Sequence, residues 1–248
     1  MTTELKTKTK TRVIVGIIAG LMLLSSVAVY VAIIIANNKD KNSVSDELSE
    51  ELLAAYEEKG KAYDAKVTEF NDSTLSLRND NLESLIALRS EVKAFNAASA
   101  NEGGLKKTDI TAGTGRTIDA NSVDYGLFYI GFCPDESVFD SSFDNFSAPS
   151  SLKSPLVVTS TDLLIPGMYQ GLDGMSLGGS RVITIPGELA YGDTRDDLCD
   201  GANTPLKFIV KPVELSAESL KLGQEMNDLA LEAQELYYKY FVNVYGAN

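Results

Sequence analysis

The stretch from 163 to 192, LLIPGMYQGLDGMSLGGSRVITIPGELAYG, constrains the fold of this chain more than any other. Its apolar start leads into Pro166, and proline is tolerated at the first position of a helix, so we expect one or two helical turns there. The glycine pair at 178–179 then turns the chain into the β-branched run 181–185, which predicts a strand. Proline and glycine at 186–187 end that strand. The stretch therefore predicts a short helix followed directly by a strand.

The sequence on both sides of this stretch has the character of strands. From Ile110 onward the helical pattern ends, and apolar side chains alternate well through 122–132. Residues 156–158 predict a short strand and 206–215 a final one. Pro212 lies inside that final segment, which predicts an edge position or a bulge, because proline cannot donate to a strand ladder. These segments predict a mainly antiparallel sheet with one short helix, an α+β fold.

Three further blocks accompany the stretch in a fixed order. YIGF at 129–132 and SVFDSSFD at 137–144 precede it, and NTPLKFIVKPVEL at 203–215 follows it. In this combination the region from about 104 to 215 resembles the FKBP-type peptidyl-prolyl cis-trans isomerases. The resemblance implies a half-barrel antiparallel sheet around a short helix, and an isomerase that uses neither a cofactor nor a metal.

The resemblance also implies roles for single residues. Tyr191 is the implied hydroxyl donor to a substrate carbonyl, and the backbone N–H of Ile165 is the implied second donor. Asp140 is implied at the edge of the pocket, where it holds the aromatic and hydroxyl groups in place. The implied substrate-binding side chains are aromatic or aliphatic: Tyr129, Phe139, Leu156, Leu164, Met168 and Phe208.

Such a pocket suits the reaction. Rotation about a peptide C–N bond has a barrier of about 18–20 kcal/mol because that bond has partial double-bond character. The twisted state has a less polar carbonyl, so a dry, apolar site favours it over the hydrated planar state. Three positions depart from the family: Met168 replaces a common tryptophan, Leu156 a phenylalanine, and 200–202 an Ile-Pro-Pro loop. These changes predict a less aromatic or wetter pocket with reduced activity.

The N-terminal segment predicts a membrane anchor. A basic leader, 1–12, precedes the uncharged run 13–36, whose 24 residues make a helix of about 36 Å, enough for a hydrocarbon core of about 30 Å. The basic leader predicts a single-pass protein with a cytoplasmic N-terminus and an extracytoplasmic C-terminal part, in the cell membrane. A cleaved signal peptide ending near 26–28 is the alternative, although 29–35 stays apolar beyond it.

Charge and residue usage exclude other classes of protein. The formal net charge of −13, from 22 basic and 35 acidic residues, argues against a nucleic-acid partner. The chain contains no histidine, which removes Ser-His and Cys-His catalysis and argues against a zinc site. Two cysteines, Cys133 and Cys199, permit one disulfide in an exported domain or remain as two free thiols.

Helices are expected on both sides of the isomerase-like region. Residues 37–103 predict a linker and a helical hairpin, with a second, Gly-ended linker at 97–104. Residues 216–248 predict a C-terminal helix, capped by Ser216, whose apolar residues repeat as a heptad stripe. We expect this helix to pack on the hairpin as a small three-helix bundle, with 104–215 inserted into it. A homodimer that pairs the stripes between chains, helped by glycines at 16 and 20, is the competing arrangement.

Two functions from different classes follow. The first is a membrane-anchored, extracytoplasmic peptidyl-prolyl isomerase that acts on proline-containing unfolded or exported polypeptides. The second is a holdase or scaffold whose isomerase-like domain binds peptides with little or no catalysis, while the helices grip the client. A purely structural envelope protein is a weaker third hypothesis.

Overall fold

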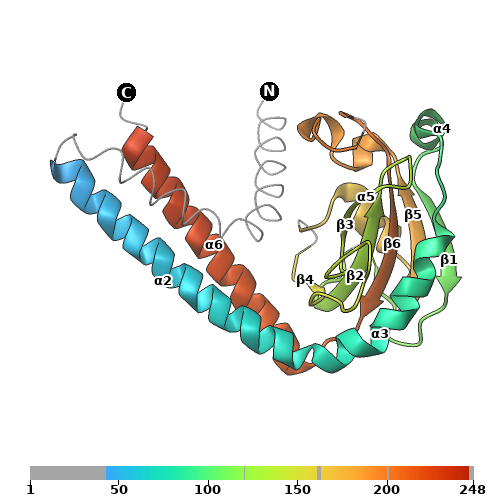
Figure 1. Cartoon of the computed structure of the whole chain (residues 1–248), viewed down its shortest axis with the longest axis horizontal. Coiled ribbons are helices and arrows are strands. Elements are labelled where there is room, and N and C mark those ends of the chain that lie inside the picture. The colour runs from blue at the N-terminus through green and yellow to red at the C-terminus, as the bar shows by residue number, and fades with distance from the viewer. Residues whose placement is uncertain (1–42, 120, 161–162, 200, 246–248) are drawn as a thin grey trace. The chain divides into compact units, whose positions relative to one another are not determined.

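The computed structural model describes residues 43–119, 121–160, 163–199 and 201–245 (Figure 1). The leader and the expected anchor at 13–36 lie outside these residues. Within the described part, no helix is long and apolar enough to cross a membrane. The described chain forms two compact units. One, called the helical pair below, joins the residues up to Phe70 with those from Lys221 onward; the other, the sheet domain, is Asn71–Leu220.

The sheet domain is built on one antiparallel sheet, in which the strands are ordered β1-β5-β6-β2-β3 and β4 pairs with β2 (Figure 1). The long strands β2 and β6 lie at its centre, in register from Gly126↔Val213 to Phe132↔Lys207. The strands are β1 Lys106–Thr111, β2 Tyr125–Phe132, β3 Val138–Ser141, β4 Leu156–Val158, β5 Ser180–Ile185 and β6 Leu206–Val213.

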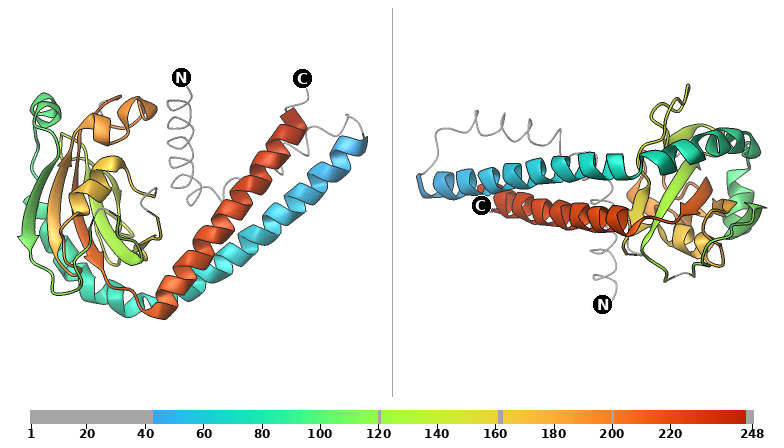
Figure 2. Two further views of the ribbon diagram at one scale, coloured as in Figure 1. Left: turned by 180° about the vertical axis from the view of Figure 1, so that it is seen from behind. Right: turned by 90° about the horizontal axis from the view of Figure 1, so that it is seen from below.

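A helix covers each face of this sheet (Figure 2). Alternate side chains of a strand point to opposite faces. Accordingly, Tyr125 and Leu127 of β2 join a core with α5, Pro166–Leu172, whereas Phe128 and Ile130 join a second core with α3, Leu75–Leu88. We call these the α5-face core and the α3-face core. Because both faces are covered, seven of the eight residues of β2 are buried.

The short helix α5 packs very closely on β5. A Cβ atom at Gly171 would lie 2.6 Å from the Ile183 side chain, and one at Gly167 would overlap Ile185. Only glycine therefore allows the helix this close to the strand. The predicted helix-then-strand order of residues 163–192 is confirmed, with α5 at Pro166–Leu172 and β5 at Ser180–Ile185.

Pro212 lies in a central strand, so the expected edge position is wrong. β6 pairs with β5 only as far as Val210, opposite Arg181. The carbonyl of Pro212 accepts a hydrogen bond from the Gly178 N–H at 2.7 Å, on the β5 side. The N–H and C=O of one strand residue point to the same side of the strand. The position where Pro212 lacks an N–H therefore faces β5, whose pairing with β6 has already ended at Val210. A proline is tolerated there without a bulge.

The helical pair consists of α2, Ser43–Ser73, and α6, Ala217–Tyr245, over their parts in this unit. The helices run antiparallel, with the Tyr56 and Tyr237 ring centroids 6.1 Å apart and ion pairs between Lys66 and Glu225 and between Lys59 and Glu232. The buried stripe comprises Tyr56, Tyr63, Phe70, Leu222, Ala233 and Tyr240. At the start of α6, the Ser216 hydroxyl accepts a hydrogen bond from the Ser219 N–H at 3.0 Å, as expected of a cap.

The expected hairpin of two N-terminal helices and the three-helix bundle need correction. Helix α3 belongs to the sheet domain, because its apolar residues Leu85 and Leu88 are buried in the α3-face core. Helix α2 pairs with α6 instead. The expected linker at 97–104 contains another helix, α4 Ala97–Glu102, capped by a hydrogen bond from the Ser99 N–H to the Asn96 side chain. The 3-10 turns are η1 Arg89–Glu91, η3 Gly187–Leu189 and η4 Gly192–Thr194.

Candidate active site

The sheet and α5 bring the expected site residues together. The aromatic and aliphatic ones all lie in the α5-face core or pack against it. They come from β2, β3, β4, the start of α5, the β5–β6 connection and β6, so segments far apart in sequence meet on one face. The buried members are Leu164, Ile165, Met168 and Phe208, and the partly buried members are Tyr129, Phe139, Leu156 and Tyr191.

Asp140 is held against this core by Tyr129. The Tyr129 hydroxyl donates a hydrogen bond to Asp140 Oδ2 at 2.6 Å, and the Ser141 N–H donates to Oδ1 at 2.8 Å. Burial first, and then the nearby Asp140 carboxylate, raise the pKa of Tyr129 above its ordinary value. The phenol therefore stays protonated at neutral pH and remains a donor. Asp140, which the family resemblance implies at the edge of an apolar pocket, thus forms a polar pair with Tyr129 beside the α5-face core.

Aromatic rings from two strands pack edge to face beside this pair. The Phe139 and Phe208 centroids lie 5.6 Å apart with perpendicular planes, and Tyr129 and Phe208 lie 6.4 Å apart at 55°. Such tilted arrangements are the favoured geometry of aromatic pairs. Gly131 permits it, because a Cβ atom there would approach Phe139 to 2.6 Å and Phe208 to 2.9 Å. Sequence reasoning missed this role of Gly131.

Ile165 occupies the N-cap of α5, with Pro166 directly after it. The N–H groups at the start of a helix have no place in its hydrogen-bond ladder, so that of Ile165 suits an external acceptor. The Ile165 carbonyl accepts from the Met168 N–H at 2.9 Å, which closes the first turn. Met168 itself is buried in the α5-face core. The start of α5 thus combines a backbone donor with apolar side chains.

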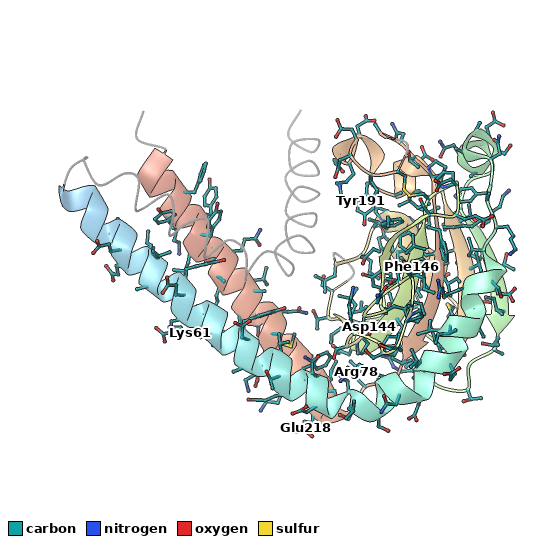
Figure 3. The ribbon with its side chains drawn as sticks, in the orientation of Figure 1. Lys61, Arg78, Asp144, Phe146, Tyr191 and Glu218 are labelled. Carbon is teal, nitrogen blue, oxygen red and sulfur yellow. A yellow bond between two sulfur atoms is a disulfide. The ribbon has the colours of Figure 1, made fainter. Side chains whose placement is uncertain are left out.

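Tyr191 lies at the end of the sheet domain that carries η3 and η4 (Figure 3). Its ring is half-buried against the α5-face core. Burial raises the pKa of Tyr191, Arg195 acts in the opposite direction, and Asp140 adds to the increase. Tyr191 and Tyr129 both pack against the α5-face core, and the Tyr129 hydroxyl is bonded to Asp140, so the three residues belong to one side of the sheet.

The rim of the site is formed by the connection between β5 and β6. A disulfide joins Cys199 in this connection to Cys133 at the end of β2, with a Cα–Cα distance of 5.6 Å. Leu198 and Cys199 pack partly buried against the α5-face core. Asp200, expected to add a charge to the rim, lies outside the described residues, whereas Gly201 and Ala202 are described and form part of a turn.

Sequence reasoning missed three contributors to this rim. Leu189 and Leu198 pack against the α5-face core, and the Arg195 guanidinium lies over the Tyr191 ring. The signal for Leu198 was available, since it is an apolar residue in an otherwise charged loop. Arg195 carries no such signal, because an arginine beside aspartates is an ordinary solvated pattern. Among the described residues, no group of three or more acidic or cysteine side chains could hold a metal ion.

Comparison with known proteins shows the family to which this chain belongs. A sequence profile of the FKBP-type peptidyl-prolyl cis-trans isomerase family matches residues 120–213. An FK506-binding protein of Neisseria meningitidis serogroup B is 33% identical over 91 residues, which cover 36% of this chain and 76% of that protein. The chain belongs to the FKBP-type peptidyl-prolyl cis-trans isomerase family.

Other relatives are longer than the shared region. The peptidyl-prolyl cis-trans isomerase Mip of Chlamydia trachomatis is 35% identical over 115 residues, or 46% of this chain and 42% of that protein. The chain thus spans less than half the length of this relative. A solved isomerase of Pseudomonas syringae pv. tomato is 27% identical, with a TM-score of 0.37, over 56% of this chain and 95% of that one.

Proposed function

We propose that the sheet domain catalyses cis-trans isomerisation of the peptide bond before proline in polypeptide substrates. The observation that carries this proposal is the 2.6 Å hydrogen bond from the Tyr129 hydroxyl to Asp140, at the edge of a core of apolar side chains. Membership of the isomerase family supports the same function.

The site's residues divide the work between desolvation and hydrogen bonding. Phe139, Phe208 and Met168 offer an apolar surface to the proline ring, which favours the less polar, twisted amide over the hydrated planar one. The Ile165 N–H and the Tyr191 hydroxyl donate to substrate carbonyls and fix the peptide on either side of the rotating bond. No covalent step and no proton transfer is required.

A proline-limited assay tests this function. Residues 43–248 should accelerate cis-trans exchange of an apolar-X-Pro peptide, a step that otherwise takes tens to hundreds of seconds. Asp140→Ala should lower kcat/KM by about tenfold or more, because it leaves the Tyr129 hydroxyl without its acceptor. Asp80→Ala, which removes an exposed carboxylate on α3, is the matched control and should leave the rate unchanged. A folded protein that gives no acceleration at micromolar concentration contradicts the proposal.

We place this activity at a membrane, outside the cytoplasm, with exported polypeptides as substrates. The support is the sequence alone: the uncharged run 13–36 directly after a basic leader. Protease added to intact cells should degrade the chain from about residue 37 onward and spare the leader. Complete protection of the sheet domain in intact cells, with digestion after lysis, would refute this topology.

A holdase activity is the second candidate, and the surface of α6 favours it. Tyr238 is 68% exposed and Phe241 49%, so two large aromatic side chains present apolar surface to solvent. Tyr238→Ser with Phe241→Ser should then weaken suppression of aggregation without changing proline isomerisation. Equal suppression by the double variant and the parent protein removes this candidate.

A further inference from the structure

Arg195 contacts Tyr191, and the proposed function assigns no role to this contact. The Arg195 guanidinium lies over the Tyr191 ring, with Cζ 5.6 Å from the ring centroid. A cation within about 6 Å of an aromatic face is attracted by the electron density of the ring. Tyr191 is the side chain expected to donate a hydrogen bond to a substrate carbonyl. Arg195 therefore contacts the ring of a residue that is expected to bind the substrate.

Asp197 holds the guanidinium in this position. Arg195 Nε donates to Asp197 Oδ1 at 2.8 Å, and a terminal nitrogen donates to Oδ2 at 3.1 Å. Two parallel hydrogen bonds from a planar guanidinium to a carboxylate fix its orientation, which a single ammonium contact cannot do. The Arg195 side chain is one-third exposed, so the carboxylate, rather than close packing, decides where it points.

The Tyr191 backbone is tied to the same segment. The Tyr191 carbonyl accepts hydrogen bonds from the Thr194 N–H at 3.1 Å and the Thr194 hydroxyl at 2.6 Å. The turn between Tyr191 and Arg195 is therefore closed by local bonds, and the arginine returns over the ring of the residue four positions earlier. The disulfide at Cys199 follows two residues after Asp197 and fixes the far side of this segment.

The charge of Arg195 has the sign that makes Tyr191 a better donor. Burial and the Asp140 carboxylate both raise the pKa of Tyr191, and Arg195 lowers it. A lower pKa means a more acidic hydroxyl, which donates a stronger hydrogen bond to a carbonyl oxygen. Asp140, Tyr129 and Asp197 are the other titratable groups beside Tyr191 and Arg195, and none of them supplies positive charge.

We propose that Arg195, oriented by Asp197, is a positioning residue that holds the Tyr191 ring and strengthens its hydroxyl as a hydrogen-bond donor. This inference rests on the proposed isomerase function. The effect acts through Tyr191, so it requires no contact between Arg195 and the substrate.

A mutant cycle with Tyr191 tests the proposal. Arg195→Met should lower kcat by about two- to fivefold, the value of an exposed cation–aromatic contact. Arg195→Lys keeps the charge and loses the planar guanidinium, so its kcat should lie between those of the parent protein and Arg195→Met. In a Tyr191→Phe background, Arg195→Met should cause no further loss, because no hydroxyl remains to be strengthened. Asp197→Asn should lower kcat, as Arg195→Met does. Asp196→Asn changes an exposed neighbour and should leave kcat unchanged.

Tyrosine titration by NMR gives a second readout that a purely structural role would not change. With the tyrosine ring carbons labelled, the pKa of Tyr191 should rise in Arg195→Met and stay unchanged in Asp196→Asn. A further loss of kcat in the Tyr191→Phe background, or an unchanged Tyr191 pKa, overturns the proposal. If the parent protein isomerises no peptide, the proposed function fails by itself, and the titration still decides whether Arg195 acts on Tyr191.

Discussion

The sheet domain and the helical pair use apolar side chains in different ways. The sheet is buried on both faces, so consecutive residues such as Leu127 and Phe128 each enter a core. Each helix of the pair buries one stripe, and α6 also exposes Tyr238. The comparison shows that a central strand gains burial from nearly every residue, whereas a helix in a two-helix pair gains it only from the residues of its apolar stripe.

The largest expected effect lies in the sheet domain. Phe128 is fully buried in the α3-face core. Phe128→Ala should lower the free energy of unfolding by about 3–5 kcal/mol, because it removes a large apolar surface and leaves a cavity. Unfolding by urea, followed by circular dichroism, measures this loss.

Tyr238→Ala in the helical pair is the matched control for Phe128→Ala. It also truncates an aromatic ring, but one that is 68% exposed, so its effect should stay within about 0.5 kcal/mol. A loss of stability for Tyr238→Ala that approaches that of Phe128→Ala would mean that the helical pair has an apolar partner in solution.

The disulfide should give the next largest effect. It closes a sequence separation of 66 residues within the sheet domain, and such bonds typically contribute about 2–4 kcal/mol. Replacing Cys133 and Cys199 together by serine should lower the stability of the sheet domain by this amount and leave the helical pair unchanged. Mass spectrometry after alkylation of unreduced protein checks the bond first. Two alkylated thiols there would show that the pair is not joined in solution.

Alkaline pH should affect both regions through buried tyrosines. In the helical pair, burial raises the pKa of Tyr63 to about 12, with a smaller contribution from Asp64. In the sheet domain, burial raises the pKa of Tyr125 to about 12, although Arg116 acts in the opposite direction. An unfolded tyrosine loses its proton near pH 10. The folded state therefore gains stability from these groups below about pH 10 and loses it as the pH rises toward 12.

Two phenylalanine variants assign this alkaline loss to its region. Tyr63→Phe should reduce the loss in the helical pair only, and Tyr125→Phe in the sheet domain only, each by about 2 kcal/mol at most. Urea unfolding at about pH 9 and about pH 11 measures the difference. An alkaline loss that neither substitution changes would trace to other groups.

The sequence predicted the sheet domain better than the helices because the two depend on different information. The positions of β5 and α5 follow from proline, glycine and β-branched residues that act locally. The family motifs predicted a set of site residues, and the fold gathers these residues at the α5-face core. The stripes of α3 and α6 predicted helices but not their partners. Leu85 of α3 fits a sheet face as well as another helix, since an apolar stripe does not specify what covers it.

The parts of the site that sequence reasoning missed depend on contacts across the fold. Gly131 is needed only because Phe139 and Phe208 converge on it from two other strands. Pro212 is tolerated in a central strand because β5 stops pairing before it. Neither fact is present in the local sequence, where a glycine weakens a strand and a proline indicates an edge.

The smallest expected effect concerns an ion pair of the helical pair. Glu225 on α6 forms ion pairs with two lysines: Lys66 of α2 at 3.0 Å and Lys221 of α6 itself at 3.6 Å. These lysines draw the pKa of Glu225 below its ordinary value, with the hydrogen bond from Lys66 as the largest cause. Lys66→Met removes the ion pair between the helices together with the Lys66–Glu69 pair within α2. Lys221→Met removes only the pair within α6. Exposed ion pairs contribute little to stability, so Lys66→Met should lower the stability only slightly, and Lys221→Met less. The difference should shrink in about 1 M salt, where such charges are screened.

Urea unfolding of both variants at low and high salt checks this order. A loss of several kcal/mol for Lys66→Met, unchanged by salt, would show that the helical pair relies on charge where the sheet domain relies on burial.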